Sequence, residues 1–467
     1  MPDSTPLHYR SMTEQIEALE SGEITAVELV EACLARIDAL NDQLNSIVTV
    51  NATDALAQAQ AVDEANSRCE LLAALSGIPI AVKDSIPTAG IRTTDNSRLL
   101  EHWIPEHDAA VIQSLKDAGA IIIGKTNLNE FGWSRPSEAD LFPPPWNPWN
   151  PEYMSVGSSS GSGGAASAGM CSAAIGTDGG GSIRLPGGAH GLVGMKPTHG
   201  IVSRHGMDHN SHSEISPLTR TVADTALMLD AMATYIPEDD MSWPEVRPRY
   251  LKNIDTDISG WRIGVPRTFV ESAPNEPEVV HAYEQFLRDL ESIGCELVDI
   301  DLRGMAEARM ANFIVLNAET YQRHASTLKS RWHEYGPITR VYLLQGAFLS
   351  AEDMLNAATV GRSVRTYLSM LFRDENLKAI ATPTSPFITA ERSRRPGEHA
   401  RGINACYTAP TNITGNPSVS IPAGMSDSTG LPIGMMLTGD QHEDLALLQL
   451  AHTYEAATEW HTLHPDI

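Results

Sequence analysis

Apolar and polar residues follow two different periods in the first part of the chain. From Thr25 to Ala39 apolar residues recur at the spacing of one helix face, and Glu28 stands where a capping box with Thr25 requires it. Residues 77–83 and 120–123 are instead short apolar runs, which are typical of buried strands. Residues 108–118 predict a helix between them. These segments therefore have the order strand, helix, strand.

The C-terminal third repeats this pattern, with short β-rich runs at residues 377–382, 418–421 and 433–437. Buried strands that alternate with helices predict an α/β fold. We expect a large mixed, mostly parallel β-sheet that is covered by α-helices on both faces.

Residues 237–349 are richer in charged helical sequence than the rest of the chain. Within them, residues 278–293 and 306–328 are helix candidates. We expect this stretch to be a helix-rich excursion from the sheet, and no linker sequence separates it from the rest of the chain. We therefore expect a single domain over residues 1–467.

Composition and charge narrow the functional classes. The chain has 467 residues, of which 33 are basic and 59 acidic, so its net charge is -26, and this opposes binding to a phosphate backbone. Its five cysteines are far apart and odd in number, which favours reduced thiols and a cytoplasmic location. There is no apolar run of about 18 residues or more and no secretory signal, so we expect no membrane contact.

The most unusual stretch is a Gly/Ser run over residues 157–164, which is followed by the segment Gly176 to Arg184. A flexible linker is a weaker interpretation, because residues 165–175 are small, apolar and suited to tight packing. Three consecutive glycines before Ser182 can instead turn sharply and aim several N–H groups at one point, as an oxyanion hole requires.

Two other motifs fit the letters of the sequence but not its predicted structure. Gly157 to Gly161 matches a nucleophile elbow centred on Ser159, yet the three prolines at 143–145 cannot form the strand that must precede it. Gly119 to Thr126 matches a phosphate-binding loop, yet its middle residues form a predicted strand. We favour neither interpretation.

Seven segments resemble the amidase signature family, in the order in which that family has them. They are Lys83-Asp84 after a Gly-Ile-Pro strand, Ala118-Gly119 to Asn127 with Glu130-Phe131, the Gly/Ser run, Gly179 to Arg184, Gly194 to Thr198, Pro217 to Asp224 and Asn412 to Pro417. The resemblance covers nearly the whole chain and implies the fold of that family.

The resemblance also implies roles for individual residues. The relay lysine of the family falls on Lys83, its cis-peptide serine on Ser158 and its nucleophile on Ser182. The oxyanion hole falls on the backbone N–H groups of Gly179, Gly180, Gly181 and Ser182, and the supporting network on Ser159, Asp178 and Arg184.

These residue types suit acyl transfer. A serine hydroxyl is a weak nucleophile until a neighbouring group takes its proton, and a neutral lysine can begin that relay. The pKa of a free lysine is about 10.4, so burial must lower the pKa of Lys83 toward neutrality. A lysine that is only salt-bridged, for example to Asp84, is the structural alternative.

Further side chains are candidates for substrate contact. Trp146 and Trp149 precede the Gly/Ser run among prolines, where they form a pocket wall or simply pack on those prolines. His209 and His212, with His205 and Asp208, form a dense cluster in a loop, but nothing in the sequence fixes the geometry of a zinc site. We predict that the protein needs neither a metal nor another cofactor.

The main hypothesis is a stand-alone hydrolase that cleaves a carbon–nitrogen bond of a small-molecule amide. The glutaminase subunit of a tRNA-dependent amidotransferase is the alternative within the family; the sequence after Glu319 lacks the tyrosine- and arginine-rich pattern that we expect for it. A non-catalytic binding protein is a third hypothesis, but Lys83, Ser158 and Ser182 are all present. The sequence leaves a homodimer open.

Overall fold

The apolar runs of the sequence become strands of one twisted sheet in a computed structural model. The structure describes residues 5–133, 135, 137, 139–208, 210–244, 247–392 and 405–467. Within these residues the sheet has 11 strands in the order β1-β3-β2-β4-β6-β5-β10-β11-β9-β7-β8. The strands are β1 (Ile47–Val50), β2 (Pro79–Lys83), β3 (Ile121–Thr126), β4 (Ala173–Asp178), β5 (Val193–Lys196), β6 (Glu214–Thr219), β7 (Arg262–Val265), β8 (Glu296–Asp299), β9 (Leu377–Pro383), β10 (Ser418–Met425) and β11 (Pro432–Thr438).

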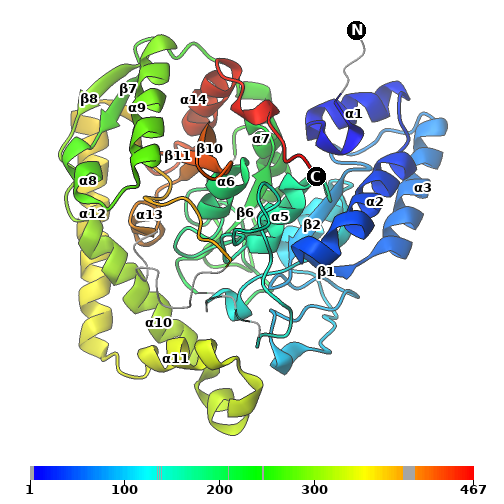
Figure 1. Ribbon diagram of the computed structural model, residues 1–467, viewed down its shortest axis with the longest axis horizontal. Helices are drawn as coiled ribbons and strands as arrows, with labels where there is room; N and C mark the ends of the chain where they lie inside the picture. The colour runs from blue at the N-terminus through cyan, green and yellow to red at the C-terminus, as the bar shows by residue number, and fades with distance from the viewer. Residues whose placement is uncertain are drawn as a thin grey trace.

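Helices surround this sheet, and their arrangement is shown in Figure 1. They are α1 (Met12–Ser21), α2 (Ala26–Leu44), α3 (Ala52–Ser67), α4 (Ala110–Asp117), α5 (Ser160–Ser167), α6 (Arg184–His190), α7 (Val222–Met232), α8 (Arg267–Ser272), α9 (Pro277–Ser292), α10 (Met305–Ser330), α11 (Pro337–Gly346), α12 (Ala351–Asp374), α13 (Pro410–Thr414) and α14 (Asp444–Ala456). Helix α2 begins with the predicted capping box of Thr25 and Glu28. No helix in the described part of the chain is long and apolar enough to cross a membrane.

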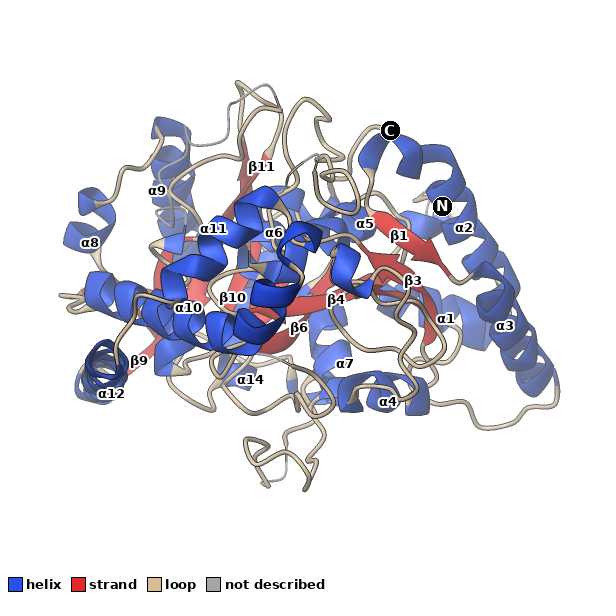
Figure 2. Cartoon of the chain, turned by 90° about the horizontal axis from the view of Figure 1, so that it is seen from below, coloured by secondary structure: helices blue, strands red, loops and turns tan. Residues whose placement is uncertain are grey.

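Both faces of the sheet are buried, as the α/β prediction requires. Neighbouring residues of β4 belong to different apolar clusters: Ala173 and Ile175 belong to the cluster that includes residues of α4, α7 and α14, whereas Ala174 belongs to the cluster that includes residues of α5. Successive side chains of a strand point to opposite faces, so these two clusters lie on opposite sides of the sheet. Figure 2 shows α4, α7 and α14 on one side of the strands and α5 and α6 on the other.

The predicted mixed α/β sheet is therefore confirmed, but the expectation that it is mostly parallel is wrong. Within the described strands, four neighbouring pairs are parallel and six are antiparallel. The physical reason lies in the connections. Strands β5 and β6 are neighbours without a crossover helix between them, and β10 turns directly into β11, so each pair must run antiparallel.

The stretch 237–349 is helix-rich, and it also supplies strands to the sheet. Two of its segments are β7 and β8, which pair in parallel with each other, while β7 also pairs in parallel with β9. The long helix α10 then packs against α12 and α13 in a separate apolar cluster around Ile413. Both helices, which are far apart in sequence, contact the end of β4: Asn312 of α10 donates to the carbonyl oxygen of Gly179, and Asn412 of α13 donates to that of Asp178.

Candidate active site

The predicted relay lysine stands at the end of β2 inside the protein. Lys83 is fully buried, and its Nζ donates hydrogen bonds to Ser158 Oγ at 2.7 Å and to Thr177 Oγ1 at 2.8 Å. Burial lowers the pKa of Lys83 from about 10.5 to about 7, although the carboxylates of Asp95 and Asp178 act in the opposite direction. The burial and the lowered pKa of Lys83 are the properties that the predicted base requires.

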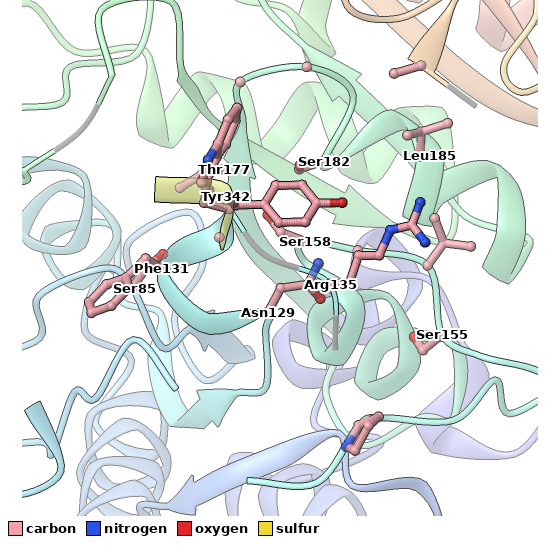
Figure 3. A pocket seen from close by; sticks show the side chains of 18 of the residues that line it. Ser85, Asn129, Phe131, Arg135, Ser155, Ser158, Thr177, Ser182, Leu185 and Tyr342 are labelled. Atoms are coloured by element: carbon pink, nitrogen blue, oxygen red, sulfur yellow. The ribbon is translucent and has the colours of Figure 1, made fainter. Parts of the chain in front are cut away.

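Ser158 and Ser182 lie beside each other on one wall of a cavity (Figure 3). The peptide bond between Gly157 and Ser158 is cis, and the backbone N–H of Ser159 donates to the carbonyl oxygen of Ser182 at 3.3 Å. The hydroxyl of Ser182 makes no hydrogen bond to any described residue. Hydrogen bonds of this kind are often not formed in the absence of a substrate, so this geometry does not argue against the predicted role of Ser182.

Asp178 and Arg184 form the buried base of the glycine turn that carries Ser182. Both side chains are fully buried, and the guanidinium Nη2 lies 2.9 Å from Asp178 Oδ1. Burial alone would raise the pKa of Asp178, but the charge and hydrogen bonds of Arg184 hold that pKa well below its usual range. Arg184 also donates to Thr411 Oγ1 at 2.6 Å and to Asn412 Oδ1 at 2.7 Å. The turn is therefore tied to helix α13.

This ion pair gives a direct stability prediction. We expect Arg184→Met to lower the free energy of unfolding by about 3–5 kcal/mol, because Asp178 would keep a buried charge without its partner. Denaturant unfolding measures the effect. The control is Arg267→Met, which breaks an exposed ion pair with Asp299 and should cost no more than about 1 kcal/mol. Equal losses in the two variants would contradict the prediction.

The prediction that Gly181 is one of the four oxyanion donors is wrong. The N–H of Gly181 donates to Asp178 Oδ1 at 2.7 Å, so it is not free to bind a substrate oxygen. The backbone at Gly181 has a φ of 122°, and a side chain there would collide with Thr408, which explains the glycine. Gly179, Gly180 and Ser182 line the cavity, and their N–H groups remain as candidate donors.

The cavity in front of the serines has a volume of about 1120 Å³. Its wall includes Trp146, over whose ring the guanidinium of Arg392 lies at 4.1 Å. Tyr342 and Arg135 also line the cavity, and Figure 3 shows their side chains in the same view as Ser158. The other aromatic side chains of the wall are Trp103, Phe131, Trp133, Phe313, Tyr335 and Phe387.

The other residues that the sequence suggested for substrate contact do not themselves line the cavity where the structure describes them. Trp149 is not part of the cavity wall, because its indole N–H donates to the carbonyl oxygen of His190 at 2.9 Å. His205 is exposed and His212 half-buried, and neither lines the cavity. His209 lies outside the described residues. The histidine loop nevertheless reaches the cavity through Asp208, Asn210 and Ser213.

Sequence reasoning assigned no role to several residues of this site. Thr177 accepts a hydrogen bond from Lys83, and it directly precedes the predicted Asp178, so its position in β4 is a usable signal. Asn412 binds both Asp178 and Arg184; it belongs to a segment that carries the family resemblance. Asp95 and Arg323 also line the cavity, and no motif in the sequence marks them.

Comparisons with known proteins agree on one family. A family model described as Amidase matches residues 28–448. A glutamyl-tRNA(Gln) amidotransferase subunit from Chloroflexus aggregans is 36% identical over 99% of both chains. A peptide amidase from Stenotrophomonas maltophilia is 27% identical, covers 97% of this chain and 98% of its own, and superimposes with a TM-score of 0.85. A chain from an inhibitor-bound vestigial protein complex related to an s-triazine catabolic enzyme is 27% identical, with a TM-score of 0.89 and coverages of 96% and 98%.

Proposed function

Because this chain belongs to the amidase family, we propose that it hydrolyses the carbon–nitrogen bond of an amide through an acyl-enzyme on Ser182. The observation that carries the proposal is the buried hydrogen bond of 2.7 Å from Lys83 Nζ to Ser158 Oγ beside the candidate nucleophile. A neutral amine in that position can take a proton that Ser158 passes on from Ser182.

The proposed reaction has two halves. In the first, Ser182 Oγ attacks the amide carbon, its proton passes to Ser158, and the proton of Ser158 passes to Lys83. The N–H groups that face the cavity at Gly179, Gly180 and Ser182 stabilise the oxyanion. The proton then returns through Ser158 to the departing nitrogen, and the carbon–nitrogen bond breaks. In the second half, water attacks the acyl-enzyme and the same relay carries its proton.

Two functions are compatible with this chemistry, and they differ in the amide that is cleaved. The wide cavity with its aromatic wall supports a stand-alone hydrolase that acts on a small amide with an apolar body, as the sequence suggested. The glutamyl-tRNA(Gln) amidotransferase subunits among the relatives, at 34–36% identity over 99% of this chain, support the second setting. There, glutamine is the amide and other subunits receive the ammonia. The relatives favour this second candidate over the stand-alone hydrolase.

The test is a substrate panel assayed with the purified chain. It contains glutamine, uncharged aliphatic primary amides and aryl amides, with ammonia or amine release as the readout and Ser182→Ala protein as the blank. Turnover of glutamine alone would support the glutaminase subunit, whereas turnover of uncharged amides with little of glutamine would support the stand-alone hydrolase. Absence of turnover across the panel, together with an unreactive Ser182, would contradict the acyl-enzyme proposal.

A further inference from the structure

Asp95 is a carboxyl group in the cavity for which the proposed reaction has no use so far. It follows β2 in a loop and lines the cavity together with Ser158 and Ser182. Its backbone has a left-handed φ of 53°, and its N–H donates to the carbonyl oxygen of Asp84 at 2.9 Å. Asp84 directly follows Lys83 in the chain. The loop is thus fixed to the end of the strand that carries the relay lysine.

A second contact fixes the same loop on the other side of the relay. The carbonyl oxygen of Asp95 accepts a hydrogen bond from the N–H of Phe131 at 3.0 Å. The next residue is Gly132, and a Cβ atom on it would lie 3.3 Å from Ser158 Oγ and 3.8 Å from Lys83 Nζ. Asp95 is therefore hydrogen-bonded to the residue before Gly132, and the backbone of Gly132 lies beside both residues of the proposed relay.

Burial raises the pKa of the Asp95 carboxyl group to about 7, although the charges of Lys83 and Arg323 act in the opposite direction. Within the described residues its buried Oδ1 has no hydrogen-bond partner, and the side chain forms no ion pair. The charged groups that face it are Lys83, Asp84 and Glu130, together with Arg323 from α10. A buried acceptor without a donor is costly, so a native protein that keeps one normally has a use for it.

Asp178 is the other carboxylate that acts on Lys83, but its charge is already balanced. Arg184 binds both of its oxygens, at 2.9 and 3.0 Å, and Asn412 Nδ2 lies 3.1 Å from Oδ1. Both carboxyl groups raise the pKa of Lys83. The carboxyl group near the relay that lacks such partners at Oδ1 is therefore that of Asp95.

We propose that Asp95 is a positioning residue whose carboxylate balances the positive charge that Lys83 gains when the proton of Ser182 arrives through Ser158. The inference rests on the proposed function. The proton moves from Ser182 to Ser158 and from Ser158 to Lys83, so an ammonium ion forms in a fully buried site while the serine oxygen bonds to carbon. Without a nearby negative charge, that ammonium ion would carry a large desolvation cost.

Charge balance by Asp95 has a consequence that packing alone does not have. Removal of the carboxylate makes Lys83 harder to protonate, so the acid limb of the reaction must move to lower pH. The rate on the plateau must fall at the same time, because the ammonium ion of the transition state loses its partner. A residue with a merely structural role would lower the plateau and leave the limb in place.

The experiment is Asp95→Asn, which keeps the size of the side chain; asparagine also tolerates the left-handed backbone. The readout is the rate at which a fluorophosphonate modifies Ser182 as a function of pH, so no substrate needs to be known. The serine oxygen displaces fluoride from phosphorus, and its proton leaves through the same relay. We expect the acid limb to move down by about one pH unit and the plateau rate to fall about tenfold.

Asp95→Glu and Asp224→Asn complete the experiment. The glutamate variant keeps the charge and should keep the limb near its wild-type position. Asp224 is a buried carboxyl group that holds the start of α1, with Met12 N–H at 3.0 Å; its replacement should not move the limb. A limb that stays in place in Asp95→Asn, or moves equally in Asp95→Glu, overturns the inference while the acyl-enzyme proposal stands. Wild-type protein that does not react at Ser182 overturns both.

Discussion

Protein with the change Ser182→Ala will fold normally and will lose amide hydrolysis, by a factor on the order of 10⁶ in kcat. The physical reason is that no other described hydroxyl lies on the glycine turn in front of the remaining oxyanion donors, so the acyl-enzyme cannot form. Steady-state ammonia release and thermal unfolding measure the two parts of this prediction. The control is Ser21→Ala in helix α1, far from the cavity.

Mass spectrometry after fluorophosphonate treatment gives an independent answer to the same question. The adduct should lie on Ser182 in the wild-type protein and be absent from the Ser182→Ala protein. An adduct on Ser159 would instead support the nucleophile elbow that the sequence pattern also allows. The structure disfavours that outcome, because Ser159 Oγ is buried and hydrogen-bonded to the backbone of Thr177.

The change Lys83→Met should lower kcat by about 10²–10⁴-fold, with a much smaller change in KM. Methionine keeps most of the buried volume, so the loss reports missing proton transfer and not missing packing. The pH profile of the wild-type protein is the second readout. Only the neutral amine accepts a proton, and burial lowers the pKa of Lys83 to about 7, so activity should rise with pH through about 7.

Lys196 supplies a matched control for this experiment. It is also fully buried and its pKa is lowered by burial to about 8, but its Nζ donates to the carbonyl oxygen of Pro197 and it does not line the cavity. Lys196→Met should therefore leave the acid limb of the profile in place. If Lys83→Met kept a near-normal kcat at about pH 8, where the relay lysine should be neutral, the proposed relay would be wrong.

The sequence predicted the elements of the fold better than their pairing. Apolar period and turn residues depend on neighbours within a few positions, and for that reason β2, β3, α2 and α10 appear close to their predicted ranges. Strand direction depends on which distant segments meet. The antiparallel pairs among β5, β6, β10 and β11 are set by contacts between residues near 195, 218, 420 and 436, and no local pattern reports those contacts.

In the candidate site, too, the sequence predicted the residues in distinctive local segments but not those whose position depends on distant contacts. Lys83, Ser158 and Ser182 lie in short segments with unusual composition, and the structure brings them to one wall. Gly181 was misassigned because its neighbours alone do not reveal which N–H groups Asp178 uses. Asp95 escaped notice because its position depends on a loop that bonds at once to β2 and to the segment around Phe131. The roles of these residues in the reaction remain predictions.

The hydrogen bonds between Arg184 and helix α13 also determine when the glycine turn can be completed during protein synthesis. Arg184 Nη2 donates to Asn412, 228 residues further along the chain. A ribosome adds roughly 5–20 residues per second, so about 11 to 46 seconds pass between synthesis of the arginine and of its acceptor. During that time the glycine turn lacks the segment that anchors it. The nascent chain thus cannot complete the hydrogen bonds of its glycine turn until α13 has been synthesised, and we expect a chain that stops before α13 to be inactive.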